Sequence, residues 1–376
     1  MLRDAPRPPD GGTAAVAAES ESADRTATLG AALNDGRRRA IVTLLAIALL
    51  ATAVAAVCLG PVIVHPGDVF RIVIHHTTSA SVAVDWKPSE DAVIWQVRLP
   101  RVLLGCVVGA ILGSAGLAMQ AMVRNPLAEP HLLGVTAGAS TGAAAAILFG
   151  IGAAFAGNST AAMAFLGALA AMVLILVLAR TDRGSSPTRL LLAGVAVGYL
   201  LSALTSLLIL LASSNEGARA VLFWLLGSLA QAKWATLPAV TVAAIVGIGA
   251  LFLCRRRLDV VSVSDELARS VGVHPDRTRF ILVVVVALCI GAAVAVSGGI
   301  GFVGLVVPHI ARRFVGSAHR FALPAAALLG AVLLVWADVA ARLVLEPREL
   351  PIGVVTGLIG APVLIVLVRR LSHGPV

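Results

Sequence analysis

The sequence has little charge. Of its 376 residues, 13% are Asp, Glu, Lys or Arg, whereas 59% are hydrophobic, and the mean hydropathy is +0.95. A soluble domain usually has about 25% charged residues, so this composition excludes an ordinary soluble protein and indicates a membrane protein with many spans. The net charge of +9 must then belong to loops. It reports topology, and we expect no nucleic-acid partner.

The motifs of several enzyme classes are also missing. No GxxxxGK[ST] segment occurs, so the chain has no phosphate-binding loop of the P-loop type. The apolar segments contain no arrangement of serine, histidine and carboxylate that suggests an intramembrane enzyme. Cys58, Cys106, Cys254 and Cys289 lie far apart in or beside apolar segments, without metal-ligand spacing. The sequence therefore predicts a chain that is not an enzyme and binds no metal or cofactor itself.

Long apolar segments are what the sequence does contain. A hydrocarbon core about 30 Å thick is crossed by about 20 apolar residues of helix. By this rule we predict about ten spans, the eighth of them short, at 40–64, 99–123, 132–156, 160–179, 189–213, 236–254, 280–297, 302–316, 321–344 and 351–368. A further apolar piece, 220–231, is too short to cross and is expected to be an interfacial or re-entrant helix.

The two ends of the chain are predicted to lie in the cytoplasm. Residues 1–36 are rich in Ala, Pro, Gly, Ser and acidic residues, which favours a disordered tail before a transmembrane domain at 37–376. The first apolar run begins near Ala40 and is about 25 residues long, too long for a signal peptide. Ten crossings put both termini on one side. Outside the tail, that side has eighteen Arg and Lys residues and the other has eight, so it is the cytoplasmic side.

Glycines recur every four residues in several spans, a spacing that lets helix backbones approach closely in lipid. Ordinary packing explains each one singly, and together they predict a compact bundle. The repeated glycines are Gly105, Gly109 and Gly113; Gly134, Gly138 and Gly142; Gly194 and Gly198; and Gly353 and Gly357.

Charges are almost absent from the middle of the spans. The exception is Asp338 with Arg342, four residues apart and able to pair near the outer end of a helix. A proton-coupled transporter normally needs a buried carboxylate relay, and this pair suits that role poorly. His65, His75 and His76 lie in the long outer loop 65–98 without a partner cluster, so we expect solvated residues and not a metal site.

The polar loop 255–279 is predicted to contain a short helix on the cytoplasmic side. Ser264 is a good N-cap, Asp265 and Glu266 place negative charge in the first turn, and Gly272 can adopt the left-handed conformation that ends a helix. A helix of about two turns follows.

One face of this short helix is apolar. Leu267 and Val271, four residues apart, share a face, whereas Arg269 and Ser270 point elsewhere. The loop alone leaves two interpretations open. The helix either only connects two spans or presents a docking surface to a cytoplasmic partner.

Five stretches together resemble the FecCD-type permeases, the membrane subunits of ABC importers for iron-siderophore, haem and vitamin B12. The resemblance extends from about Arg38 to Arg370. Its motifs are WQVRLPRVLLGCVVGAILGSAGLAMQAMVRNPLAEPHLLGVTAGAS at 95–140, SPTRLLLAGVAVG at 186–198, FWLLGSL at 223–229, GGIGFVGLVVPHIARR at 298–313 and ELPIGVVTGLIGAP at 349–362.

The resemblance implies an all-α, BtuC-like permease fold that dimerises around a central pathway in the cytoplasmic membrane. The second permease would be an identical chain or a paralogue. Two cytoplasmic ATPases, which hold the ATP and Mg, would dock on one side and an extracytoplasmic substrate-binding protein on the other. The remaining surface would contact membrane lipid.

The resemblance also implies roles for particular residues. The loop helix would be the coupling helix that inserts into the ATPase, through Ser264, Asp265, Glu266, Leu267, Ala268, Arg269, Ser270, Val271 and Gly272. Outer arginines would pair with glutamates of the binding protein, namely Arg98, Arg101 and Arg342, although membrane-interface anchoring also explains Arg98 and Arg101. The cytoplasmic gate would comprise Asn125, Leu127, Ser186, Pro187 and Thr188, where Pro187 replaces a hydroxyl residue of a relative.

The leading interpretation is a permease subunit of an ATP-driven importer, most often a ferric siderophore importer within this family, with haem and vitamin B12 as alternatives. An ion-coupled secondary transporter would need carboxylates at mid-membrane depth. A membrane scaffold or receptor that transports nothing would have no reason for the helix at 264–272.

Overall fold

The computed structural model describes residues 11–60, 64–78, 84–130, 134–155, 158–179 and 187–372, and no strand occurs in these ranges. The all-α fold predicted from the sequence is confirmed. The helices are α1 (Gly11–Cys58), α2 (Pro66–Thr77), α3 (Pro88–Ala92), the π-helix η1 (Val93–Arg98), α4 (Leu99–Val123), α5 (Val135–Phe149), the 3-10 turn η3 (Ala153–Phe155), α6 (Ser159–Ala179), α7 (Pro187–Leu210), α8 (Asn215–Leu225), α9 (Leu237–Leu253), α10 (Arg255–Val263), α11 (Asp265–Ser270), α12 (Pro275–Ser297), α13 (Val303–Val315), α14 (His319–Leu343) and α15 (Ile352–Ser372).

Each of the ten predicted spans contains a helix, but not every helix is long enough to cross a membrane alone. Among the described residues, six helices are sufficiently long and apolar, and the bent pair α9 and α10 makes a seventh if counted as one span. The apolar helices α5 and Ile352–Val366 are shorter, and α13 has 13 residues. The count of ten crossings stays a prediction.

Two of the short helices begin inside the bundle. An added Cβ at Gly116, in the C-terminal third of α4, would lie 2.0 Å from the carbonyl oxygen of Gly304, at the start of α13. An added Cβ at Gly304 would lie 2.9 Å from Pro130, which shortly precedes α5. After α4 ends, the chain therefore folds back along about the last two turns of α4 before α5 starts. This re-entrant course explains why α5 and α13 are short.

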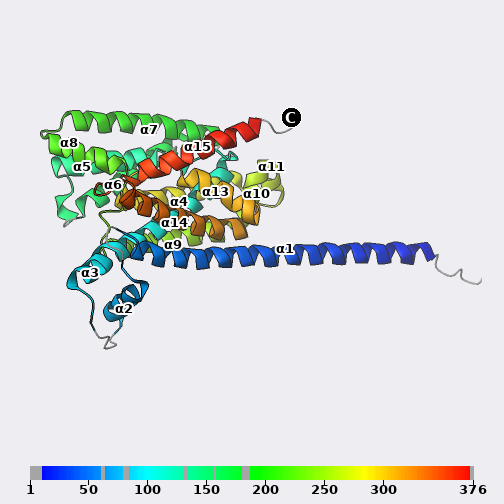
Figure 1. Cartoon of the computed structure of the whole chain (residues 1–376). Coiled ribbons are helices and arrows are strands. Elements are labelled where there is room, and N and C mark those ends of the chain that lie inside the picture. The colour runs from blue at the N-terminus through cyan, green and yellow to red at the C-terminus, as the bar shows by residue number, and fades with distance from the viewer. Residues whose placement is uncertain are drawn as a thin grey trace, which may run out of the picture.

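The bundle is organised around α4, which contacts α14, α13, α12, α9 and α10 (Figure 1). Most α4 residues are buried. The glycine spacing predicts this packing correctly. Gly109 faces Gly330 of α14 so closely that a Cβ on either residue would approach the other's carbonyl oxygen to 2.3 Å or less. Gly138 of α5 meets Gly167 of α6 in the same way. Small residues thus set the distances between the central helices.

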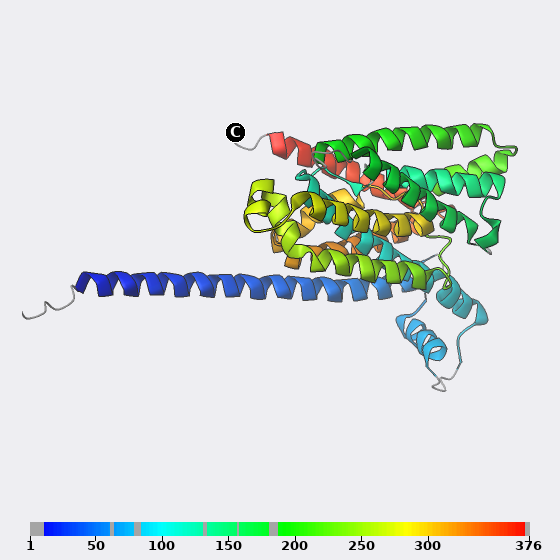
Figure 2. The same cartoon turned by 180° about the vertical axis from the view of Figure 1, so that it is seen from behind.

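The two ends of the bundle differ in structure. Helices α10 and α11 lie at one end, together with the C-terminal turns of α15, whereas α2 and α3 form a hairpin at the other end (Figures 1 and 2). The N-terminal part of α1 projects beyond the α10–α11 end. The described ends of α1 and α15 therefore lie on the same side of the bundle as the loop 255–279. Ten crossings and the cytoplasmic location of the termini stay predictions. The cytoplasmic assignment of that side rests on its arginines.

The backbone of α1 is helical from Gly11, where Ala and Glu favour helix and no proline lies between 11 and 36. The separate tail at 1–36 stays a prediction. Another segment differs from expectation. The apolar piece 220–231 is helical only up to Leu225, within α8, and continues as turns. There Ser228 N–H donates to the carbonyl of Ser297 at 2.8 Å.

Candidate functional site

The helix predicted in the polar loop is α11, and both of its caps are confirmed. The Ser264 backbone is extended, and its hydroxyl oxygen accepts a hydrogen bond from Leu267 N–H at 3.0 Å. At the other end Gly272 adopts φ +78°, a left-handed conformation that favours glycine. The chain then turns back, and Val273 N–H donates to the carbonyl of Ala268 at 2.8 Å. Local residue chemistry therefore determines both ends of this helix.

The apolar face of α11 points away from the protein. The side chain of Leu267 is 42% exposed and that of Val271 is 57% exposed, whereas Ala268 on the opposite face is fully buried. Val263, at the end of α10, extends the exposed apolar surface. If this loop only connected two spans, polar side chains would be expected at these exposed positions. This exposed apolar patch on a polar loop makes α11 the candidate docking surface, and its role as a coupling helix stays a prediction.

The carboxylate of Asp265 links α11 to two transmembrane helices. Asp265 accepts two hydrogen bonds from the guanidinium of Arg279, at 2.6 and 3.0 Å, and lies 3.3 Å from Nη1 of Arg124. Arg279 belongs to α12, is buried, and also donates to the carbonyl of Met122 in α4 at 3.3 Å. One carboxylate therefore joins α11 to the ends of both α4 and α12. The sequence predicts Asp265 as a first-turn charge and a residue of the coupling helix, but not its contacts with Arg279 and Arg124.

The hydrogen bonds from Arg279 hold the pKa of Asp265 below its ordinary value, although partial burial acts in the opposite direction. A carboxylate with a lowered folded pKa stabilises the folded state above its unfolded pKa of about 4. That contribution is lost as the pH falls through the folded pKa. The contact between Asp265 and Arg279 is thus intact at neutral pH.

The substitution Asp265→Asn is expected to loosen α11. It removes a charged acceptor from a hydrogen bond of a kind that contributes about 1.5–3 kcal/mol, so amide hydrogen exchange in 265–273 should rise about tenfold. The matched control is the neighbouring Glu266→Gln, because Glu266 is exposed and should leave exchange unchanged. Equal exchange in the two variants would show that Asp265 does not fasten the helix.

A second contact at this end joins α10 to α14. Asp259 accepts from His319 N–H at 2.9 Å, and the Nδ1 atom of His319 lies 2.6 Å from the same carboxylate oxygen. Burial raises the pKa of Asp259, but the hydrogen bonds from His319 outweigh it and the net shift is downward. The two residues are 60 positions apart, so the sequence offered no signal for this pair.

The predicted docking arginines are not on the surface. Arg98 and Arg101 are each 4% exposed and Arg342 is 6% exposed. The structure therefore does not present these three guanidinium groups at its surface. The sequence prediction places charged residues near the ends of spans in the aqueous loops. The side chains of these three arginines instead turn inward, where carboxylates and carbonyl groups pair with them. Interface anchoring does not describe Arg98 and Arg101 either.

The buried arginines converge on Asp338 and on the end of α1. Arg101 Nε donates to Asp338 at 2.9 and 3.1 Å, and its Nη1 donates to Glu349 at 3.0 Å. Arg342 pairs with Asp338 at 3.2 Å, as the four-residue spacing predicts, without hydrogen-bond alignment. Arg98 and Arg342 donate to carbonyl groups of α1 and the residue after it, Val57, Cys58, Ala56 and Leu59. Binding-protein docking through these arginines would require these contacts to be exchanged, and it stays a prediction.

The predicted gate residues are only partly described. Asn125 accepts from Leu127 N–H at 2.9 Å through its side chain, a turn that directs the chain out of α4. Ser186 lies outside the described residues, and Pro187 and Thr188 are described only as backbone at the start of α7. The gate assignment therefore stays a prediction.

Sequence reasoning overlooked Glu129, in the re-entrant segment after α4. Its carboxylate accepts a hydrogen bond from the backbone N–H of Phe302, which has φ +67° and precedes α13. A carboxylate at a helix N-terminus satisfies a free N–H and is favoured by the helix dipole. In the sequence, the segment NPLAEP is notable only as part of the family motif at 95–140, and it does not indicate the contact of Glu129 with Phe302.

The outer histidines are not simply solvated. His65 caps α2 by accepting from Gly67 N–H at 3.2 Å, and His76 lies 3.1 Å from Asp91 while stacking on Trp95 with ring centroids 4.3 Å apart. Among the residues that the structure describes, no group of three or more His, Cys, Asp or Glu side chains could hold a metal ion.

Comparison with known proteins gives consistent matches along the chain. A model of the FecCD transport family matches residues 45–370. The Fe(3+)-citrate import permease YfmD of Bacillus subtilis is 39% identical over 75% of this chain and 82% of its own length. The hemin transport permease HmuU of Yersinia pestis is 40% identical over 76% and 86%. A solved inward-facing structure of a metal-chelate type ABC transporter has a TM-score of 0.76 at 31% identity, covering 88% of this chain and 99% of that chain.

Proposed function

Because the chain belongs to the FecCD transport family and is a permease of the ABC importers for metal chelates, haem and vitamin B12, we propose that it carries a ferric siderophore from a binding protein to the cytoplasm. Relatives named for Fe(3+)-citrate and iron(3+)-hydroxamate import, 39% and 35% identical, support an iron chelate. Other relatives, 40% and 38% identical, are named for transport of hemin and vitamin B12, so these two compounds are the alternative cargoes.

The observation that supports ATP-driven coupling is the exposed, fastened helix α11. Its Leu267 and Val271 side chains offer an apolar surface, and Asp265 ties that surface to α4 and α12. In the proposed mechanism two cytoplasmic ATPases hold ATP and Mg, and each receives α11 of one permease chain in a groove. Closure of the ATPase pair moves α11 as a rigid body. The attached helices then switch the pathway between two states.

The first experiment measures ATP hydrolysis by this permease with its cognate ATPase in lipid. Binding protein loaded with a ferric siderophore, haem or cobalamin is added in turn, and uptake of the same cargo is followed. The proposal expects stimulation and uptake with the ferric siderophore. Stimulation only by binding protein loaded with haem or cobalamin would change the proposed cargo but still support an ATP-driven importer. Gradient-driven uptake without an ATPase would instead support a secondary transporter.

The substitution Leu267→Asp is expected to weaken association with the ATPase about tenfold. Burial of a leucine side chain contributes about 1.5–3 kcal/mol, and a carboxylate in its place would also have to lose water. The measurement is co-purification of the ATPase in lipid or mild detergent. The control is Leu345→Asp at the opposite end of the bundle, a residue that is 54% exposed and should leave association unchanged. Equal association of both variants would remove α11 from the interface.

A further inference from the structure

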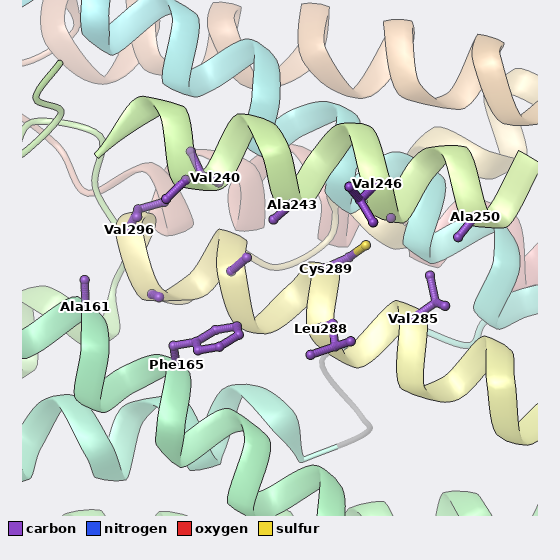
Figure 3. Close-up of a pocket in the computed structure, with 14 residues that line it drawn as sticks. Ala161, Phe165, Val240, Ala243, Val246, Ala250, Val285, Leu288, Cys289 and Val296 are labelled. Carbon is purple, nitrogen blue, oxygen red and sulfur yellow. The ribbon is translucent and has the colours of Figure 1, made fainter. Parts of the chain in front are cut away.

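An apolar groove lies between α9 and α12, with α6 along one side (Figure 3). Its volume is about 440 Å³, within the range of sites that hold small organic ligands. Val240, Ala243 and Val246 project from α9 toward α12, and Phe165 reaches in from α6. All 14 lining residues are Ala, Val, Leu, Phe, Gly or Cys. A groove with so few hydrogen-bonding groups suits a hydrocarbon chain.

The groove is elongated along the helices. On α9 its lining runs from Ala239 to Ala250, which is about 16 Å at the helical rise of 1.5 Å per residue. Beside it, α9 presents Val242 and Ile245, which are 59% and 68% exposed. This surface belongs to a helix of the membrane bundle, so the groove opens toward the bilayer. Its length and direction fit an extended acyl chain.

Arginines stand at one end of the groove. α9 bends by 57° into α10 immediately after the groove, and Arg255, Arg256 and Arg257 occupy the first positions of α10. The neighbouring α12 begins with Arg277 in its first turn. Arg256, Arg257 and Arg277 are exposed, and among the described residues none of the three forms an ion pair with a carboxylate. Arg256 and Arg257 thus follow the groove residue Ala250 by six and seven residues, and Arg277 precedes the groove residue Val285 of α12 by eight.

We propose that this groove binds one anionic phospholipid, with an acyl chain between α9 and α12 and the phosphate held by Arg256, Arg257 and Arg277. Guanidinium groups bind phosphate oxygens in bidentate pairs, and basic clusters at the cytoplasmic ends of transmembrane helices bind anionic headgroups. A neutral phospholipid would offer the same hydrocarbon without net charge. The observed charge therefore favours an anionic headgroup. The proposal requires only that the bundle lies in a membrane and does not depend on the cargo.

The bound lipid is tested by native mass spectrometry of the permease after exchange into vesicles of phosphatidylglycerol and phosphatidylcholine. We expect one phosphatidylglycerol to remain per chain. Ala243→Phe should fill the groove and abolish retention, whereas Ala170→Phe, at an exposed position of α6 outside the groove, should retain it. Each of Arg256→Gln, Arg257→Gln and Arg277→Gln should lower retention about fivefold, and Arg313→Gln, an exposed arginine of α13, should not.

A second measurement does not depend on a bulky residue in the groove. In a background in which the five native tryptophans are replaced by phenylalanine, Leu288→Trp puts a fluorophore on the groove wall at a side chain that is 39% exposed, and Val177→Trp puts one on the exposed face of α6. Brominated phosphatidylglycerol should quench the tryptophan at 288 more strongly than brominated phosphatidylcholine, and both should quench position 177 equally. Equal quenching at 288, or equal retention by the two phenylalanine variants, would overturn the proposal. A change from dimer to monomer in Ala243→Phe would instead assign the groove to a second chain.

Discussion

Asp338→Asn is expected to destabilise the permease by about 3–5 kcal/mol. The Asp338 side chain is 2% exposed and pairs with Arg101 and Arg342. Removal of its charge would leave two buried guanidinium groups without their shared counter-ion, and loss of one partner of a buried pair costs about this much. The measurement is unfolding of the purified protein by denaturant in mild detergent, followed by far-UV circular dichroism.

The control for this prediction is Glu349→Gln. Glu349 accepts from the same guanidinium of Arg101 at 3.0 Å, but its side chain is 48% exposed. Water replaces an exposed partner easily, so this variant should lose less than about 1 kcal/mol. The two carboxylates therefore separate the effect of burial from that of the contact. Similar losses in both variants would show that Asp338 is not the centre of the cluster.

Gly330→Ala is expected to cost about 3 kcal/mol or more, although it adds a single methyl group. The new Cβ would lie 2.1 Å from the carbonyl oxygen of Gly109, and that atom belongs to a backbone that has no alternative rotamer. Helices α4 and α14 would have to separate along the centre of the bundle. Overpacking of a well-packed core costs about 1–3 kcal/mol, and occasionally more. The measurement is the same unfolding experiment.

Gly249→Ala is the control, because here the added methyl group is expected to leave the free energy of unfolding unchanged or to increase it. Gly249 lies inside α9, and no atom lies within 4 Å of an added Cβ. Alanine is favoured over glycine inside a helix by about 1 kcal/mol, so this variant should be unchanged or more stable. If both alanine variants have the same stability, the close contact between α4 and α14 does not limit the fold.

The features that could be predicted from the sequence depend on neighbouring residues. The caps of α11 at Ser264 and Gly272 and the pair Asp338 and Arg342 need only short spacings along the chain. Apolar length located the helices because lipid requires each span to satisfy its own backbone. Glycine spacing predicted close packing, but it did not identify which helix lies opposite.

Contacts between distant residues could not be predicted. Arg101 and Asp338 are 237 positions apart, so the sequence shows two charges and not their pairing. Arg101 was therefore assigned to the surface. The same separation hides the contact between Arg279 and Met122, 157 positions apart. Span length also assumes continuous crossing, which the re-entrant segment before α5 does not follow.

Helix α4 has charged contacts near both of its ends. Near one end Arg101 pairs with Asp338, and at the other end the Met122 carbonyl and Arg124 contact Arg279 and Asp265. A hydrogen-bonded helix of 25 residues is about 37 Å long and resists compression along its axis. An axial force applied to α4 at the α11 end would therefore move the helix as a rigid body, and Arg101 at the other end would move with it.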